Sequence, residues 1–283
     1  MSKITWIASY PKSGNTWIRI VVFCALRGYL NLNELGDLIP NFSIFPNNMK
    51  GKDFDNQADI RYKWLDAQKK LTSENKNNII LKTHISAGKY DVGIFPSPEC
   101  TLNALYIVRD PRDVAVSYSK HFNTSISDAV RRMMSETHIL NAQDRSVGNK
   151  GAEFTSSWEN HVTGSWENHV TGWKNASFPV LFIKYEDLLE YPAQNISKLL
   201  EFMNIQPQIS IEEIVKLTNF SNLVGQETDS GFGEASPHTR FFRKGAKAQW
   251  KKIPSKSFQL LENKCHDLMT EFGYQSHPKK KKK

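Results

Sequence analysis

The sequence predicts a single-domain α/β protein whose mostly parallel sheet is covered by helices on both faces. Short apolar segments with the character of strands alternate along the chain with segments whose apolar residues repeat at helical spacing. A chain of 283 residues that is 39% hydrophobic can also bury a substantial core. Alternation of this kind is typical of a parallel sheet, because the helix between two strands packs onto a face of the sheet.

Four segments are expected to form strands, at 3–9, 79–83, 102–108 and 180–185. The first strand is followed by a polar loop at 10–16 and then by an apolar helix from near Trp17 to about Arg27. Together these elements predict a strand, a loop and a helix at the beginning of the fold.

A helix is also expected after the third strand, running through Val114 to His121. Asp110 can cap its N-terminus, and Pro111 suits its first turn. Later helices are indicated by apolar residues at helical spacing, namely Ile196, Leu199, Leu200 and Met203; Ile211, Ile214 and Val215; and Leu261, Cys265, Leu268, Met269 and Phe272.

Three polar stretches, at 31–77, 123–157 and 222–242, are too long to be simple connections. We expect them to hold short helices or to act as lids, and to determine substrate choice. A perfect tandem repeat follows the second, because Ser157–Gly164 is copied as Ser165–Gly172. Two copies are too few for a solenoid, so we favour a duplication absorbed in a surface loop or an extended helix over a functional role.

Composition and charge restrict the classes of function. The formal net charge is +8, but five terminal lysines leave only +3 on the rest of the chain, which does not indicate nucleic-acid binding. We expect a domain over 1–275 and a basic, disordered tail over 276–283. No apolar run approaches the ~20 residues of a membrane span, and the start resembles a strand more than a signal peptide. We therefore expect no membrane partner.

The three cysteines, Cys24, Cys100 and Cys265, lack the spacing of a disulfide framework or a zinc site. The sequence also lacks histidine pairs at the spacing of common metal motifs, so no metal is predicted. A reducing, cytoplasmic location fits this cysteine usage best.

The polar loop after the first strand has the features of an anion-binding site in a P-loop-like position. Backbone N–H groups and a helix N-terminus converge at such a loop. Ser13, Asn15 and Thr16 add hydroxyl and amide groups, and Lys12 adds a positive charge. A plain turn is the alternative. A Walker A loop is excluded, because the lysine lies two residues before Gly14 rather than directly after a glycine.

This loop, Tyr10-Pro11-Lys12-Ser13-Gly14-Asn15-Thr16-Trp17, closely resembles the 5'-phosphosulfate loop of sulfotransferases that use 3'-phosphoadenosine 5'-phosphosulfate (PAPS). The segment from Tyr106 to Asp113, with Ser117, resembles the 3'-phosphate segment of the same family. Three further segments fall in the family's order, namely Lys82-Thr83-His84, Phe182 to Leu188 and Arg243-Lys244-Gly245. The resemblance covers residues 3 to about 252.

The resemblance implies a set of donor-binding residues. Backbone and side-chain groups of Lys12, Ser13, Gly14, Asn15 and Thr16 would hold the 5' groups. Arg109 and Ser117 would hold the 3'-phosphate, the arginine by a charge-assisted pair. The remaining contacts would come from Trp17 stacking on the adenine, Tyr185 and Phe220 bordering it, and Arg243, Lys244 and Gly245 approaching the 3'-phosphate.

The resemblance also implies the catalytic groups. His84 would act as general base toward an acceptor hydroxyl, because it closes a strand whose carboxyl end faces the ligand crevice. Lys12 and Lys82 would contribute positive charge, with Lys12 acting on the leaving phosphate of 3'-phosphoadenosine 5'-phosphate (PAP). Asp110 and Asp113 are interpreted as a helix cap and a first-turn acid rather than as magnesium ligands.

The chain departs from the family pattern in places. Many members have a second glycine and an aspartate before the tryptophan of the late loop, whereas here Ala248 and Gln249 precede Trp250. A less tightly turned loop would weaken the contacts of Lys244 and Gly245 with the 3'-phosphate. The short dimer motif of the cytosolic eukaryotic enzymes is not apparent in 251–262, which leaves the oligomeric state open. The start of the chain and its proportions look more like bacterial small-molecule sulfotransferases than like Golgi enzymes with a membrane anchor.

The leading hypothesis is therefore a PAPS-dependent sulfotransferase that acts on a small-molecule or carrier-bound hydroxyl. One alternative is a P-loop nucleoside-triphosphate kinase, which the missing Walker A lysine disfavours and which predicts Mg²⁺ dependence. Another is a PAP-binding module that has lost transfer activity. The presence of Lys12 and His84 disfavours this second alternative.

Overall fold

The computed structural model describes residues 2–48, 60–91, 93–140, 161–235, 240–242, 245 and 247–275. Its centre is a four-stranded sheet in the order β2–β1–β5–β8, in which every pairing is parallel. The strands are β1 (Ile4–Ser9), β2 (Ile79–Thr83), β5 (Thr101–Val108) and β8 (Val180–Lys184). The predicted fold class is confirmed, and the strand bounds differ from the expected ones by at most one residue.

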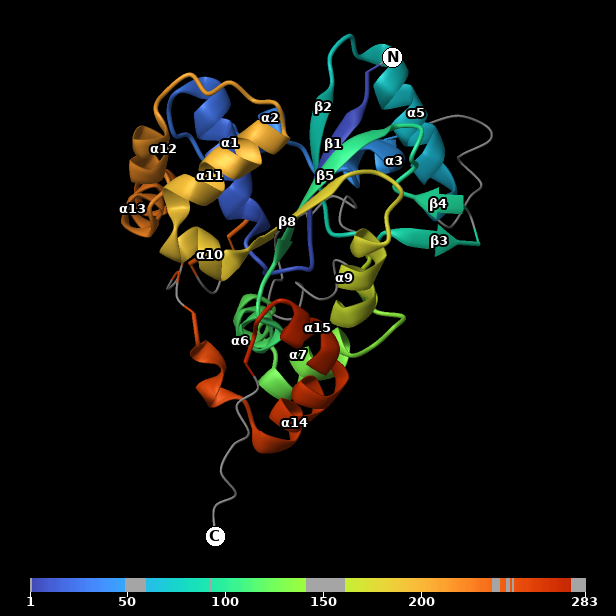
Figure 1. The fold of residues 1–283 in the computed structure, drawn as a ribbon, viewed down its shortest axis with the longest axis vertical. Coiled ribbons are helices and arrows are strands. Elements are labelled where there is room, and N and C mark those ends of the chain that lie inside the picture. Colours follow the sequence, from blue (N-terminus) through green and yellow to red (C-terminus); the bar gives the residue numbers. More distant parts are fainter. Residues whose placement is uncertain are drawn as a thin grey trace.

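Alternate residues of the central strands enter two separate cores. Ile7, Leu105 and Ile107 pack on one face against α1 (Asn15–Arg27), α11 (Pro192–Phe202) and α12 (Ile211–Leu217). Trp6 and Tyr106 belong to the core on the other face, which also contains residues of α5 (Trp64–Glu74), α9 (Trp166–Lys174) and α14 (Ser255–Lys264). Figure 1 shows α1 and α11 on one side of the strands and α5 on the other. Burial on both faces explains why the strands are nearly continuous apolar runs.

The helix that follows β5 begins as the sequence predicts. The helix α6 (Pro111–His121) has Pro111 in its first turn, and the Asp110 carboxylate accepts a hydrogen bond from the backbone N–H of Arg112 at 2.9 Å. The helix α1 begins at Asn15, two residues earlier than expected, directly after a glycine. In both cases the helix N-terminus lies at the carboxyl end of a strand, where it faces the same edge of the sheet.

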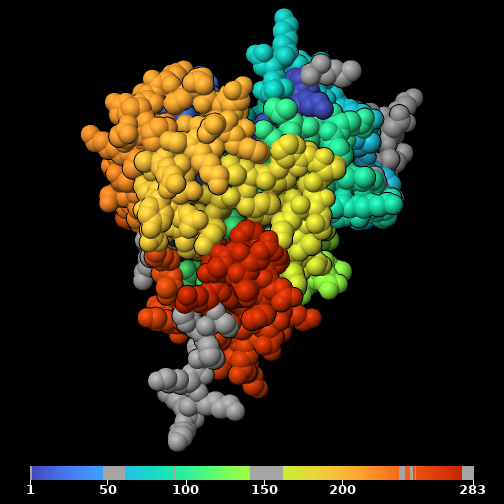
Figure 2. Space-filling model, in the orientation of Figure 1, coloured from blue at the N-terminus to red at the C-terminus, as the bar shows by residue number. Residues whose placement is uncertain are grey.

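The long polar stretches hold short helices, as expected. The first contains α2 (Leu35–Leu38), α3 (Ile44–Asn48), η1 (Ile60–Lys63) and all of α5, and the last contains most of α13 (Phe220–Ser230). The other helices among the described residues are α7 (Ile126–Met133), α10 (Tyr185–Glu190), η2 (Gln249–Lys252) and α15 (His266–Glu271). In Figure 2, α14 and α15 (red) pack at the surface beside the α9–α11 region (yellow).

Two features of the fold differ from the expectations. The helix predicted around Leu261 to Phe272 is divided into α14 and α15 at Cys265. Two antiparallel pairs were not predicted, namely β3 (Gly88–Tyr90) with β4 (Gly93–Phe95) and β6 (Ile139–Leu140) with β7 (His161–Val162). Strands of two or three residues carry no alternating pattern that the sequence could reveal.

The tandem repeat adopts two conformations. The end of its first copy forms β7, whereas the second copy supplies the N-cap Ser165 and most of α9; residues 157–160 lie outside the described part. The expectations of a surface loop or a single extended helix are therefore wrong. Trp166, His169 and Val170 of the second copy are fully buried. Burial, as the dominant cause, lowers the pKa of His169 to about 4.

This buried histidine predicts a loss of stability in mild acid. The pKa of His169 is about 4 in the fold, below its ordinary 6.5, so the unfolded chain binds more protons between these values. The stabilisation is therefore complete above pH 6.5 and is lost as the pH falls toward 4. The full loss amounts to about 3 kcal/mol at 1.36 kcal/mol per pKa unit. Urea unfolding at pH 7 and pH 4.5 measures most of this loss, about 2.7 kcal/mol for the two pH units between 6.5 and 4.5.

The matching variant is His169→Gln, which has no imidazole to protonate. Its free energy of unfolding is expected to fall less between pH 7 and pH 4.5 than that of the wild-type chain. An equal fall in both proteins would mean that other groups cause the acid sensitivity, among them His138, whose pKa burial also lowers to about 4.

Candidate active site

The loop between β1 and α1 is turned by two residues in the left-handed region. Lys12 has φ 69° and Gly14 has φ 110°. A Cβ atom on Gly14 would lie 2.6 Å from Cδ2 of Tyr185, so that position requires glycine for space as well as for conformation. A lysine held at positive φ is a strained conformation, and such strain is concentrated at functional sites. The loop is thus built to hold a specific shape.

One side chain of the loop anchors it to the sheet, and another is buried without a hydrogen-bond partner among the described residues. Asn15 donates a hydrogen bond to the carbonyl of Ile7 at 3.0 Å. Ser13 Oγ is buried and has no hydrogen-bond partner among the described residues. An unsatisfied buried hydroxyl is costly, so the loop keeps Ser13 in this position at a cost in free energy.

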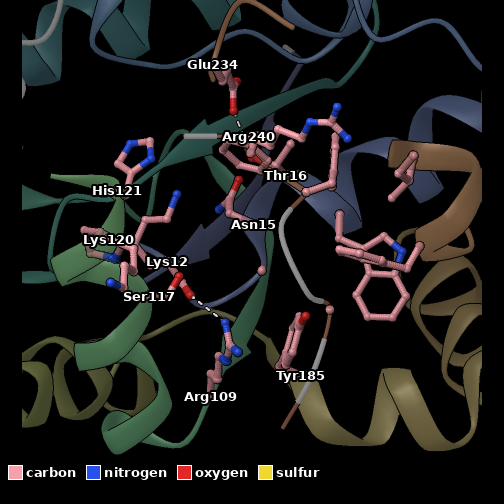
Figure 3. Close-up of a pocket in the computed structure, with 18 of the residues that line it drawn as sticks. Lys12, Asn15, Thr16, Arg109, Ser117, Lys120, His121, Tyr185, Glu234 and Arg240 are labelled. Carbon is pink, nitrogen blue, oxygen red and sulfur yellow. Dashed lines mark hydrogen bonds between the residues drawn. The ribbon is translucent and has the colours of Figure 1, made fainter. Parts of the chain in front are cut away.

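One pocket opens at the carboxyl ends of β1, β2 and β5, and Figure 3 shows some of its lining residues. It brings together most of the predicted site residues, namely Lys12, Gly14, Asn15, Thr16, Trp17, Lys82, His84, Arg109, Ser117, Tyr185, Phe220 and Gly245. Ser13 is buried within the loop and does not line the pocket. Arg243 and Lys244 lie outside the described residues.

Arg109 is fixed against the anion-binding loop. Its Nη1 donates a hydrogen bond to the carbonyl of Lys12 at 3.2 Å, and its guanidinium lies 4.1 Å from the centre of the Tyr185 ring. Figure 3 shows this arginine between the loop and the tyrosine. Stacking on one side and a backbone contact on the other hold the planar guanidinium in one orientation, which suits it to bind a phosphate.

Aromatic residues form a second part of the pocket. The Trp17 ring meets the Tyr185 ring edge-on at 5.6 Å, and Trp17 Nε1 donates to the carbonyl of Thr218 at 2.9 Å. Phe220 packs so closely on the late loop that a Cβ on Gly245 would lie 2.4 Å from its ring. The apolar faces of these three rings suit stacking and edge contacts with a purine base.

His84 lies directly after β2, at the edge of the sheet that the pocket occupies. Its Nδ1 is 2.8 Å from the carbonyl oxygen of Ser9. A carbonyl accepts only, so Nδ1 carries the hydrogen and Nε2 is the basic nitrogen of the neutral ring. The imidazole therefore has the tautomer that a general base acting through Nε2 needs.

A carboxylate that the sequence analysis missed lies among the cations of the pocket. Glu234 accepts a hydrogen bond from Thr16 Oγ1 at 2.8 Å, forms an ion pair with Arg19, and lies 3.6 Å from Lys82 Nζ. The Arg19 and Lys82 side chains are 2% and 4% exposed. Burial alone would raise the pKa of Glu234, but these cations hold it well below its ordinary value.

Glu234 lies in a segment without a recognisable pattern, so nothing in the sequence points to it. Arg19 does carry a signal, because it interrupts the apolar run of a buried helix between Ile18 and Ile20. A charged residue in such a run is rarely buried without a partner. That rule predicts a partner for Arg19 without identifying it.

The end of α6 and the late segment also line the pocket, with residues that were not predicted. They include Lys120, His121, Phe122, Arg240 and Phe241. Lys12 Nζ lies 4.4 Å from the centre of the Phe241 ring, and the backbone N–H of Phe241 donates to Glu227 at 2.6 Å. Phe241 thus places an aromatic face against the lysine of the anion-binding loop.

Asp113 holds the late loop rather than serving only as a first-turn acid. Its carboxylate accepts hydrogen bonds from the backbone N–H groups of Ala248, Gln249 and Trp250, at 2.7, 2.6 and 3.1 Å. Ala248 adopts φ 61°, a conformation that glycine would take more easily. One carboxylate of α6 therefore holds three consecutive backbone N–H groups of the loop, whereas Lys244, whose phosphate contact a looser loop would weaken, lies outside the described residues.

Comparison with known proteins gives the family. Residues 3–273 match the sulfotransferase domain. The chain belongs to the sulfotransferase domain family. Members of this family transfer a sulfonate group from PAPS, so the predicted family, enzyme class and donor chemistry agree with the match.

Curated relatives have low sequence identity to this sulfotransferase but match most of its length. Cytosolic sulfotransferase 7 of Arabidopsis thaliana is 27% identical, over 84% of this chain and 70% of the relative. Sulfotransferase 1A1 of Rattus norvegicus is 25% identical, over 92% of this chain and 81% of the relative. Sulfotransferase 1E1 of Mus musculus is 28% identical, over 87% and 76%.

Solved structures share the fold of the sulfotransferase. Mouse sulfotransferase SULT7A1, solved with PAP, superposes with a TM-score of 0.59 at 20% identity and covers 97% of this chain and 89% of its own. Retinol dehydratase, solved with androsterone and PAP, gives a TM-score of 0.58 at 20% identity and covers 97% and 82%. At this identity the likeness establishes the fold alone.

The described residues contain no helix that is long and apolar enough to cross a membrane. Within the same residues, no three or more histidine, cysteine, aspartate or glutamate side chains are grouped in a way that would hold a metal ion. Cys24, Cys100 and Cys265 are all buried and unbonded to one another.

Proposed function

We propose that this sulfotransferase moves the sulfuryl group of PAPS to the hydroxyl of a small-molecule acceptor, with His84 as general base. The observation that carries the proposal is the shared pocket at the carboxyl edge of the sheet. There the loop from Lys12 to Thr16, the guanidinium of Arg109 and the imidazole of His84 face one space. The PAP complexes of the structural neighbours support the same donor.

The donor residues divide by the chemistry they offer. The backbone of the 12–16 loop and the hydroxyl of Thr16 suit the 5' phosphosulfate, because N–H groups at a helix N-terminus favour anions. Arg109, just before α6, and Ser117, within α6, suit the 3'-phosphate. Trp17, Tyr185 and Phe220 suit the adenine. Arg243, Lys244 and Gly245 remain predicted contacts to the 3'-phosphate.

The transfer step follows from these positions. The acceptor oxygen forms a bond to sulfur while the bond from sulfur to the bridging oxygen of the donor breaks, and that oxygen leaves with PAP. His84 Nε2 takes the proton of the acceptor hydroxyl. Lys12 stabilises the negative charge that develops on the departing phosphate, and Lys82 adds positive charge beside the transferred group.

The acceptor class that we propose is a hydroxyl on a small molecule, either free or bound to a carrier. We also propose a cytoplasmic location, which the cytosolic plant relatives support. The domain over 1–275 with a separate basic tail remains a prediction.

Thermal unfolding with matched concentrations of PAP, AMP and ATP plus Mg²⁺ tests the proposal. A ligand that binds only the folded chain stabilises it by RT ln(1 + [L]/Kd), so a 100-fold excess over Kd gives about 2.7 kcal/mol. We expect PAP to raise the Tm much more than AMP, and the Arg109→Ala variant to lose most of that difference. A shift with ATP and Mg²⁺ but none with PAP would favour the kinase alternative.

A second measurement separates an enzyme from an inactive binding module. PAP release from PAPS is followed in the presence of simple phenols and aliphatic alcohols. Turnover with any of them supports transfer. Strong PAP binding with no turnover across the panel would favour a module that has lost activity.

A further inference from the structure

The helix α9 packs against the loop that carries His84. Two of its side chains donate hydrogen bonds to consecutive carbonyls of that loop. His169 Nε2 lies 3.1 Å from the carbonyl oxygen of His84, and Trp173 Nε1 lies 3.1 Å from that of Ile85. Residues four positions apart lie on the same face of a helix, so a single face of α9 makes both contacts.

The helix α9 and the loop after β2 lie close together beyond these two hydrogen bonds as well. A Cβ on Gly172 would lie 2.0 Å from the carbonyl oxygen of Ala87, so the helix can approach the loop only with glycine at that position. The first copy of the repeat also contributes, because the carbonyl of Val162 accepts a hydrogen bond from the backbone N–H of Ser86 at 2.9 Å. Both copies of the tandem repeat therefore hold the loop at 84–87.

The chemistry of His169 fixes the direction of its hydrogen bonds. The carbonyl of His84 can only accept, so Nε2 of His169 carries the hydrogen and Nδ1 accepts. The Tyr106 hydroxyl, 2.8 Å from Nδ1, is then the donor. His169 is fully buried and neutral, and it connects β5 to the residue at the end of β2 through one rigid ring.

We propose that His169 is a positioning residue for the transfer reaction, acting through the main chain of His84. The imidazole of His84 is held at Nδ1 by the carbonyl of Ser9 at 2.8 Å. Its backbone is held by the second repeat copy. With both ends fixed, the ring presents Nε2 to the pocket in one orientation. This proposal rests on the proposed role of His84 as the base.

The test compares His169→Leu, His169→Gln and His161→Leu. Glutamine keeps an N–H donor that can reach the carbonyl of His84, whereas leucine has none. His161 is a matched control because it occupies the same place in the other copy of an identical octapeptide. PAP-induced stabilisation first shows which variants fold and bind the donor product.

Steady-state kinetics with PAPS and 4-nitrophenol then measure positioning. We expect His169→Leu to lower kcat by about 10- to 100-fold, because small misplacements of a reacting group cost about that much. The KM for PAPS should change less than about 3-fold. His169→Gln should recover most of kcat, and His161→Leu should match the wild-type chain. A full kcat in His169→Leu, or a glutamine variant as slow as leucine, would overturn the proposal.

Two further measurements separate this proposal from the role of His84. If His84 is the base, adding His169→Leu to His84→Ala should cause no further loss, since the two residues act through one group. Turnover in His84→Ala close to that of the wild-type chain would instead refute the base. The ¹⁵N shifts of the His84 ring report its tautomer with no acceptor present. They should change in His169→Leu and not in His161→Leu, and unchanged shifts would refute positioning.

Discussion

Replacing His84 with alanine is expected to lower kcat by about 10²- to 10⁴-fold, the usual contribution of a general base. PAP binding should persist, because the residues that suit the nucleotide lie outside the loop after β2. They are the 12–16 loop, Arg109, Ser117 and the rings of Trp17, Tyr185 and Phe220. The measurement pairs PAP release under saturating PAPS with PAP-induced stabilisation. Loss of turnover with intact PAP binding is the result that supports the base.

The matched control is His266→Ala, which removes an exposed imidazole at the start of α15. It should leave both turnover and PAP binding unchanged. If His84→Ala kept full turnover, another group would have to accept the proton. If it lost PAP binding as well, His84 would be a structural residue of the pocket, and the fall in kcat would not report on proton transfer.

The proximity of Lys12, His84 and Arg109 in the fold could be predicted, although the three residues are far apart in the sequence. Each follows a different strand, and parallel strands end at the same edge of a sheet. Once the strands are identified, their topology brings the following residues together. Gly14 was predicted as part of the anion-binding loop, and the structure explains why glycine is needed there, since a side chain would collide with Tyr185.

The repeat shows why other parts could not be predicted. His161 and Val162 form a strand in one copy, whereas His169 and Val170 form part of a helix in the other, although the two octapeptides are identical. Local sequence cannot decide between these states, so packing against the rest of the chain decides. The contact of α9 with the loop after β2 was unpredictable for the same reason.

The carboxylates present a related difficulty. Asp113 ends the segment that resembles the 3'-phosphate segment, but its hydrogen-bond partners lie at 248–250, 135 to 137 positions further along the chain. Glu234 faces Arg19 and Lys82, which come from separate elements. A pattern along the chain reveals that a buried cation needs a partner, whereas only the fold reveals which carboxylate reaches it.

Replacing Glu234 with glutamine is therefore expected to destabilise the chain without changing its shape. The carboxylate faces two cations that are almost fully buried, and removing one partner of a buried ion pair costs about 3 kcal/mol or more. The low pKa of Glu234 means that its contribution is present above pH 4.5 and is lost as the pH falls through the lower folded pKa. The difference between wild type and variant should thus be large at pH 7 and smaller at pH 3.

The same variant tests where the pocket accepts an anion. Thr16, Arg19 and Lys82 converge on the Glu234 carboxylate, so inorganic sulfate should take its place and raise the Tm of Glu234→Gln more than that of the wild-type chain. Glu190→Gln is the control, because it breaks an exposed pair with Lys247 and should change the Tm little. Equal stabilisation of both chains by sulfate would place the anion site elsewhere. A selective gain would mean that Glu234 occupies, in the ligand-free chain, a position that a negatively charged group of the substrates can take.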